Sequence, residues 1–215
     1  ALPIWWAEIS KLPRFSWDEN RLYASNKAHM AITSNKSVLA VLNSRIAWFT
    51  LSQISVPLRL RGGLWQYQLT QQFVARVPIP DLTTQQETDL AAIAEEITAL
   101  ARSRYAMHEE MRTDISATFA GGEEISTRIT LYEWWELDGV DGLQDEVRKR
   151  YKAKIKRRDE WEKKLAEGMA EHERLTNEII ALEVRLNDIV YDAFDLTPEE
   201  RALIEETTKY PYGAV

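Results

Sequence analysis

The sequence predicts an α+β protein in which a small mixed α/β module is followed by a long, coiled-coil-like antiparallel helical hairpin. Short strand-like runs and most of the aromatic residues lie in residues 1–80. Two later stretches carry apolar residues at alternating steps of three and four, which place them along one helix face, and a glycine pair separates these stretches. We expect a small mixed module at 1–80, a helical hairpin spacer at 81–192 with an aromatic insert near 130–143, and a C-terminal capping helix and tail at 193–215.

Composition indicates a globular chain, with 45% hydrophobic and 28% charged residues among 215. The absence of cysteine excludes disulfides, thiolate zinc sites and cysteine nucleophiles. No apolar run approaches the roughly 20 residues needed to cross a bilayer, and the first residues lack a signal-peptide pattern. We therefore expect a cytoplasmic protein without a membrane partner. Because the chain opens on Ala1 rather than Met, we expect a piece of a longer protein.

Charge is distributed unevenly along the chain. Residues 1–80 contain nine Lys or Arg and three Asp or Glu, a net charge of +6, which leaves −13 for the rest of a chain whose total is −7. A basic first part can face phosphates, whereas most of the acidic remainder should not.

The first module should contain strands and one helix. "RLYAS" (21–25) and "HMAIT" (29–33) alternate as strands do. "KSVLAVLNSRIAWFTLSQI" (36–54) predicts a single helix with Ser37 as its N-cap, and Pro57 limits its extent.

The segment "LRLRGGLWQYQ" (58–68) predicts a β-hairpin, since Gly62-Gly63 tolerates the positive φ of a two-residue turn. In that register each strand residue has a cross-strand partner on the same face. The expected pairs are Arg61 with Leu64, Leu60 with Trp65, Arg59 with Gln66, and Leu58 with Tyr67. One face is then apolar and should hold the hairpin to the core through Trp65 and Tyr67, while the other is exposed and polar.

The polar face suggests DNA reading, because Arg pairs bidentately with guanine and Gln with adenine in the major groove, which a two-stranded ribbon fits. The candidates for base contacts are Arg59, Arg61, Gln66 and Gln68, and those for phosphate contacts are Lys27, Lys36 and Arg45. Asn26 and Asn35 are either further adenine readers or turn residues. An ordinary solvated sheet face would show the same alternation.

The helical part begins after Pro78 and Pro80. Thr84 with Glu87 predicts a capping box and a helix start at about residue 85. Its apolar repeat consists of Leu90, Ile93, Ile97, Leu100, Arg104, Met107 and Met111. Gly121-Gly122 should end this helix.

A second, longer helix is expected from about Gln144 to Val190. Its repeat consists of Trp161, Leu165, Gly168, His172, Leu175, Ile179, Leu182, Leu186 and Ile189. On this face His172 should be a packed or hydrogen-bonded histidine. A final helix should begin with Thr197 as N-cap, Pro198 in the first turn and Glu200 completing a capping box.

Eight basic residues lie between Arg148 and Arg158 without an intervening acid. They are either a phosphate-contacting surface, for which Arg148, Lys152 and Lys156 are the candidates, or a solvated helix face paired with flanking acids. Neither a catalytic residue nor a metal site is expected: no phosphate-binding loop, no nucleophile elbow and no metal-spaced histidines occur in the sequence.

The order "VLAVLNSRIAWFTLSQIS", "LRGGLWQYQLTQQFVARVPIP" and "LTTQQETDLAAIAEEI", with the ending "LEVRLNDIVYDAFDLTPEERALIEETTKYPYG", resembles the TaqI-like C-terminal specificity domain. That domain occurs in type II, type IIG-like, bacterial restriction-modification methyltransferases and related phage-defence methylases. The resemblance covers most of the chain, while the aromatic insert and the basic run resemble the variable middle of those proteins.

The resemblance implies a domain that reads a short sequence in double-stranded DNA for an N-terminal methyltransferase domain of the same parent chain. That separate domain would bind S-adenosylmethionine and methylate adenine, with or without a nuclease. Its N-P-P-Y motif is absent here, so we expect no cofactor and no catalysis in this fragment. The alternatives are a fragment of a type I restriction specificity subunit, which also leads from a "PIP" stretch into a long helix, and a coiled-coil adaptor that does not bind DNA.

Overall fold

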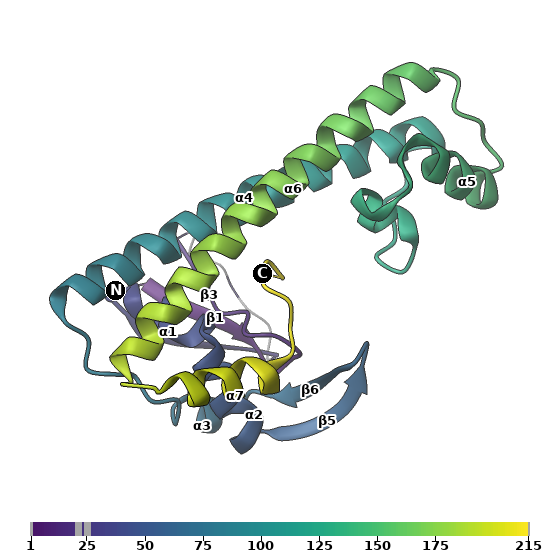
Figure 1. The fold of residues 1–215 in the computed structure, drawn as a ribbon. Helices are drawn as coiled ribbons and strands as arrows, with labels where there is room; N and C mark the ends of the chain where they lie inside the picture. The colour runs from purple at the N-terminus through teal and green to yellow at the C-terminus, as the bar shows by residue number, and fades with distance from the viewer. Residues whose placement is uncertain (1, 20–22, 24–26, 215) are drawn as a thin grey trace. The chain divides into compact units, whose positions relative to one another are not determined.

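The computed structural model describes residues 2–19, 23 and 27–214 and shows the expected α+β architecture (Figure 1). The strands are β1 (Leu2–Ala7), β2 (Ile9–Ser10), β3 (Ser16–Trp17), β4 (Ala28–Thr33), β5 (Val56–Arg61) and β6 (Leu64–Gln68). The helices are α1 (Ser37–Asn43), α2 (Arg45–Ile54), α3 (Gln71–Val74), α4 (Thr84–Phe119), the 3₁₀ helix η1 (Thr130–Glu136), α5 (Gly139–Tyr151), α6 (Arg158–Ala193) and α7 (Pro198–Thr208).

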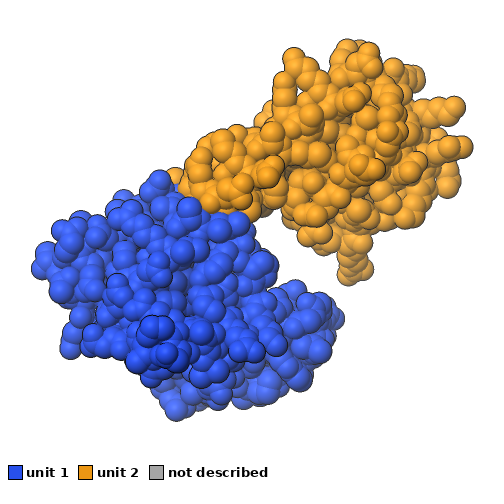
Figure 2. All heavy atoms as spheres, viewed as in Figure 1, with its two compact units in different colours: residues 1–98, 179–215 blue, residues 99–178 orange. Residues whose placement is uncertain are grey.

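The chain divides into two compact units, shown in Figure 2. Unit 1 comprises residues 1–98 and 179–215, and unit 2 comprises residues 99–178. Both long helices contribute a segment to each unit. The sequence-based boundaries near residues 80 and 192 remain predictions.

Unit 1 contains two three-stranded antiparallel sheets, with strand orders β3-β1-β4 and β2-β6-β5. Its core joins these sheets to helices α1, α2 and α3 and to the nearby segments of α4 and α6, and α7 packs against α2. Trp6 lies in this core, and its indole N–H donates to the Leu69 carbonyl at 2.8 Å. The strand expected at "HMAIT" is confirmed as part of β4, whereas the one expected at "RLYAS" falls outside the described residues apart from Tyr23.

Two helices replace the single helix expected over residues 36–54. Ser44 is extended, with ψ at 158°, and its hydroxyl accepts from Ala47 N to cap α2. The preceding Asn43 uses its side-chain amide to accept from Phe15 N and donate to Phe15 O, both at 3.0 Å. Because both side chains bond to backbone groups, they compete with helix continuation. The expected Ser37 cap is also displaced: Asn35 Oδ1 accepts from Ser37 N at 2.9 Å.

In unit 2, α4 and α6 pack antiparallel, since Arg104 bonds to Thr176 and His108 to His172 while Asp114 pairs with Lys164. The aromatic insert forms η1 and places Trp134, which is fully buried, between these helices. The core of this unit is completed by Met111, Ile115, Ile125, Leu131, Val140, Leu143, Val147 and Leu165.

The helix ends show which capping predictions were right. Thr197 and Glu200 form both bonds of the expected capping box at the start of α7. At the start of α4 the box lies one residue earlier than expected, because Thr83 and Gln86 exchange bonds. Glu87 instead accepts from Asn35 Nδ2 at 2.9 Å.

The largest correction concerns the second long helix, which does not run from Gln144. Helix α5 ends at Tyr151, Lys152 adopts a left-handed conformation with φ at 55°, and α6 begins only at Arg158. The Gln144 side chain accepts from Ile155 N at 2.9 Å and so holds the linker in place. Among the helices in the described ranges, none is both long and apolar enough to cross a membrane.

Candidate nucleic-acid interface

The β5–β6 hairpin has the predicted turn and most of the predicted register. Gly62 and Gly63 have φ values of 58° and 75°, as a two-residue hairpin turn requires. Arg61 pairs with Leu64, Leu60 with Trp65, and Arg59 with Gln66.

The register departs from the prediction beyond Arg59, because Tyr67 pairs with Pro57 rather than with Leu58. Leu58 is the extra residue of a β-bulge on the outermost strand of the sheet. Proline has no N–H to donate to a ladder and is tolerated at edge strands and bulges, which explains the irregularity beside Pro57.

The polar face of the hairpin presents the predicted base-reading side chains. Arg59 Nε donates to Gln66 Oε1 at 2.6 Å across the two strands. Arg61 is exposed beside the turn and makes no ion pair with any residue that the structure describes. Gln68 is half-buried at the base of the hairpin, where its amide donates to Glu8 Oε1 at 2.8 Å. Arg61 is therefore the most available of the four side chains.

The apolar face is covered only at its base, contrary to the prediction that both aromatics join the core. Tyr67 packs edge-on against the buried Trp48 with ring centroids 5.8 Å apart. Trp65 is 49% exposed and its partner Leu60 57% exposed. Figure 1 shows the reason, since the hairpin projects past the helices of its own unit. The tip thus exposes both faces.

Lys36 and Lys27, the other two candidates for phosphate contacts in this unit, differ in exposure. Lys36 is half-buried and pairs with Glu95 at 2.7 Å and with Glu19 at 3.6 Å. The hydrogen bond to Glu95 raises the pKa of Lys36. Lys27 is exposed in the turn before β4, and its carbonyl accepts from Glu8 N at 2.9 Å.

Arg45 is a structural residue in this fold, which argues against the predicted phosphate contact. Its side chain is buried, with a guanidinium that donates to Thr208 Oγ1 and to the Tyr210 carbonyl, both at 2.9 Å, and lies 2.9 Å from Glu205 Oε2. The same group stacks on Tyr212, with the ring centroid at 3.9 Å. These contacts attach the C-terminal segment to α2.

The two asparagines considered as adenine readers are also resolved in part. Asn35 acts as a turn residue, because its side chain accepts from the backbone and hydroxyl of Ser37 and donates to Glu87. Asn26 lies outside the described residues.

The three candidates in the basic run lie on different elements because the expected helix breaks. Arg148 lies in the last turn of α5, Lys152 caps that helix, and Lys156 lies in the linker. All three are exposed. Part of the run also forms the expected local ion pairs, since Glu146 binds Lys149 at 3.0 Å and Arg150 at 2.9 Å, and the bond from Lys149 lowers the pKa of Glu146.

His108 and His172 form a packed, hydrogen-bonded pair, as was expected for His172. His108 Nε2 lies 2.8 Å from His172 Nδ1, and both rings stack on Trp135, with centroids 3.8 Å and 4.9 Å away. Burial lowers the pKa of His108 to about 3, with further lowering from His172 and from nearby arginines. No group of three potential metal ligands occurs among the described residues.

Sequence reasoning missed two surface features, the exposed apolar face of the hairpin tip and a basic hollow beside the linker. The exposed apolar face depends on how far the core extends under the hairpin, and the alternation of apolar and polar residues along a strand does not show this. The second was partly signalled by the basic run, but a continuous helix would have carried Lys154 and Lys156 away from Phe119 and Trp161, with which they line the hollow.

Comparison with known proteins adds one match. A profile described as a domain of unknown function, DUF8810, matches residues 83–190, which extend from the start of α4 almost to the end of α6. No curated protein and no solved structure matches the chain. Since the profile covers half of the sequence, the chain belongs to the DUF8810 family.

Proposed function

We propose that this chain is the DNA target recognition part of a restriction-modification or phage-defence adenine methyltransferase of the cytoplasm. The catalytic domain, with its S-adenosylmethionine, would be a separate part of the parent chain. The proposal is carried by one observation, the projecting β5–β6 hairpin with the exposed Arg59 and Arg61 and the half-buried Gln66 on one face. A two-stranded ribbon of this kind fits the major groove, and arginine is the side chain most often used there to read guanine.

Electrostatics support the same surface. Arg59 and Arg61 are both exposed on this face, so the hairpin carries local positive charge although the chain as a whole is negative. Arg61 is the best candidate for a base contact because it is exposed, whereas Arg59 and Gln66 must exchange their mutual bond for bonds to a base. Arg148, Lys152 and Lys156 of unit 2 would supply contacts to phosphates, which orient a duplex without reading it.

The test is selection of binding sites from a randomised duplex library by the full-length protein and by its Arg61→Ala variant. Loss of one base contact should cost about 1–3 kcal/mol and relax the preference at one position of the selected site. Arg76→Ala is the matched control, because Arg76 is an exposed arginine of unit 1 outside the hairpin.

Two results would count against the proposal. If the unaltered protein enriched no sequence and its duplex binding did not depend on salt, a coiled-coil adaptor would be the better description. If Arg76→Ala and Arg61→Ala relaxed the same position equally, the hairpin would not be the reading element.

A further inference from the structure

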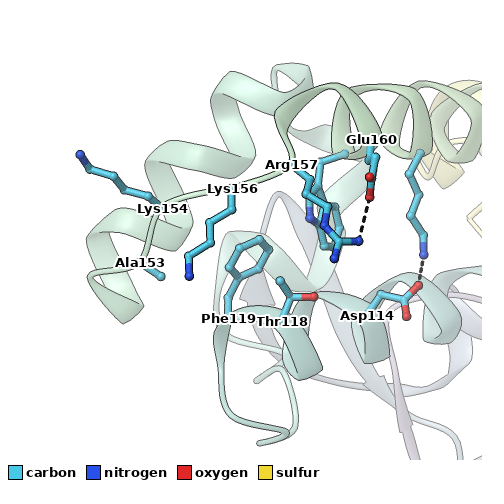
Figure 3. Close-up of a pocket in the computed structure, with 10 residues that line it drawn as sticks. Asp114, Thr118, Phe119, Ala153, Lys154, Lys156, Arg157 and Glu160 are labelled. Carbon is cyan, nitrogen blue, oxygen red and sulfur yellow. Dashed lines mark hydrogen bonds and ion pairs between the residues drawn. The ribbon is translucent and has the colours of Figure 1, made fainter.

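Unit 2 contains a hollow of about 660 Å³ to which the proposed function assigns no ligand, although Lys156 on its wall is one of the proposed phosphate contacts. Its walls come from the C-terminal end of α4, the linker at 152–157 and the first two turns of α6 (Figure 3). The hollow exists because α5 ends at Tyr151 and α6 begins only at Arg158, where the sequence had predicted one continuous helix.

The two acidic side chains on the walls are already paired. Glu160 accepts from Arg157 at 3.3 Å, and Asp114 forms an ion pair with Lys164, as the dashed lines in Figure 3 mark. Their negative charge is thus compensated within the hollow and does not repel an anion there.

Two linker lysines supply positive charge beyond these pairs. Lys154 and Lys156 are exposed, and neither bonds to any of the residues placed by the structure. In Figure 3 the Lys156 side chain points toward the side of Phe119, while Lys154 extends outward at the rim. An anionic group entering the hollow would contact Lys156 first. The long side chain of Lys154 would then turn inward from the rim to contact the same group.

The backbone that carries these lysines is held in place before any ligand arrives. Ala153 and Ile155 are half-buried against the core of unit 2, so Lys154 and Lys156 alternate with them on the exposed side of the linker. The Gln144 side chain bonds to Ile155 N and to the Ala153 carbonyl. A preordered site binds with a smaller entropy cost than a free loop would.

An aromatic wall faces the same space. The Phe119 and Trp161 rings are tilted at 42° with centroids 5.2 Å apart, and both side chains are only half-buried. Aromatic rings beside cationic side chains are the combination that binds nucleotides of any sequence, with the base on the ring and the phosphate on the cation.

We propose that this hollow binds one nucleotide unit, with its base against Trp161 and Phe119 and its phosphate at Lys156 and Lys154. The unit is either a free nucleotide or a residue of a single DNA strand, since the two share this chemistry. The inference stands independently of the hairpin, which lies in the other unit.

The test is calorimetric titration of the intact protein with deoxyadenosine monophosphate, inorganic phosphate and a short single-stranded deoxyoligonucleotide. The variant that removes the phosphate site carries Lys154→Ala with Lys156→Ala. The matched control carries Lys149→Ala with Lys163→Ala, which removes two exposed lysines of unit 2 that do not line the hollow.

We expect the Lys154→Ala, Lys156→Ala variant to bind the nucleotide ligands about tenfold more weakly than the unaltered protein, with a reduced salt dependence. The control variant should bind them with unchanged affinity. Trp161→Leu should weaken nucleotide binding but not the weak binding of inorganic phosphate, because only the base uses the ring. Binding of the mononucleotide identifies a free nucleotide as ligand, and binding of the oligonucleotide alone identifies a strand.

The inference is overturned if neither nucleotide ligand binds the unaltered protein, or if both lysine pairs weaken binding equally. It is also overturned if inorganic phosphate binds as tightly as the mononucleotide. Circular dichroism shows whether each variant is folded. If Trp161→Leu does not fold, the two lysine variants still decide the test, because they change only exposed side chains. Arg61→Ala should leave mononucleotide binding unchanged, so failure of this site and failure of the hairpin proposal are distinguishable.

Discussion

Gly168 of α6 should be essential to the packing of unit 2, although alanine is the better helix former. An added Cβ at this position would lie 2.7 Å from Cη2 and 3.1 Å from Cζ3 of Trp134, and 3.2 Å from the Met111 methyl. Trp134 cannot move away easily, because its ring is fully buried and packs edge-on against His108 and Trp135, with centroids 6.0 Å and 5.8 Å away.

Two opposing effects determine the result of Gly168→Ala. Alanine should gain about 1 kcal/mol of helix propensity. Overpacking a dense core costs about 1–3 kcal/mol, and a 2.7 Å contact with a buried ring belongs at the upper end of that range. We therefore expect a net loss of about 1–2 kcal/mol in the free energy of unfolding.

Trp134→Phe provides the matched background, because it removes the ring atoms that would clash. It also breaks no bond, since the Trp134 indole nitrogen is buried without a hydrogen bond to any described residue. In this background Gly168→Ala should be neutral or stabilising, which gives a coupling of about 1–3 kcal/mol in a double-mutant cycle.

The assay is urea denaturation of the four proteins followed by far-ultraviolet circular dichroism, with amide hydrogen exchange to assign the change to residues 99–178. The reasoning is refuted if Gly168→Ala stabilises the unaltered protein. It is equally refuted if Trp134→Phe leaves the effect of Gly168→Ala unchanged.

Two further predictions concern buried polar groups. Arg45→Met should lower the free energy of unfolding by about 3 kcal/mol, because it removes the bonds to Thr208 and Tyr210 and the ion pair with Glu205, and a loss below about 1 kcal/mol in urea denaturation would contradict this role. Lowering the pH from 7 to 5 should destabilise unit 2 by about 2 kcal/mol, because the unfolded chain protonates His108 near its ordinary pKa of about 6.5 while the folded state, with a pKa of about 3, does not. Hydrogen exchange at both pH values should show this loss reduced in His108→Gln, with the part due to His172 remaining because burial also lowers the pKa of His172, and retained in full in His29→Gln. The reverse pattern would exclude His108 as the cause.

Features that depend on a few neighbouring residues were predictable from the sequence. The Gly62-Gly63 turn and the Thr197–Glu200 capping box need only residues within one turn of each other, and both are confirmed. The apolar repeats were likewise sufficient to predict the antiparallel pairing of α4 with α6, because periodicity specifies which face is buried.

Features that depend on distant partners were not predictable in the same way. Asn43 interrupts the first expected helix because it bonds to Phe15, which lies 28 residues earlier. Gln144 stabilises the break in the second because it reaches Ile155, 11 residues later. In each case a side chain satisfies backbone groups that a continuous helix would have satisfied itself, and helix propensity alone favours the wrong result.

The candidate site was harder to predict than the fold, because it depends on which side chains of the hairpin the hydrophobic core covers and which it leaves exposed. Alternation assigns Trp65 and Tyr67 to one face, and the structure agrees, but only Tyr67 has Trp48 beneath it. Conversely, a lone arginine in an apolar helix has the same sequence pattern whether it reaches solvent or binds a tail from the other end of the chain, as Arg45 does with Tyr210. Exposure of an apolar side chain and burial of a charged one are therefore the two observations that most changed the site, and both direct attention to the hairpin tip rather than to the helix behind it.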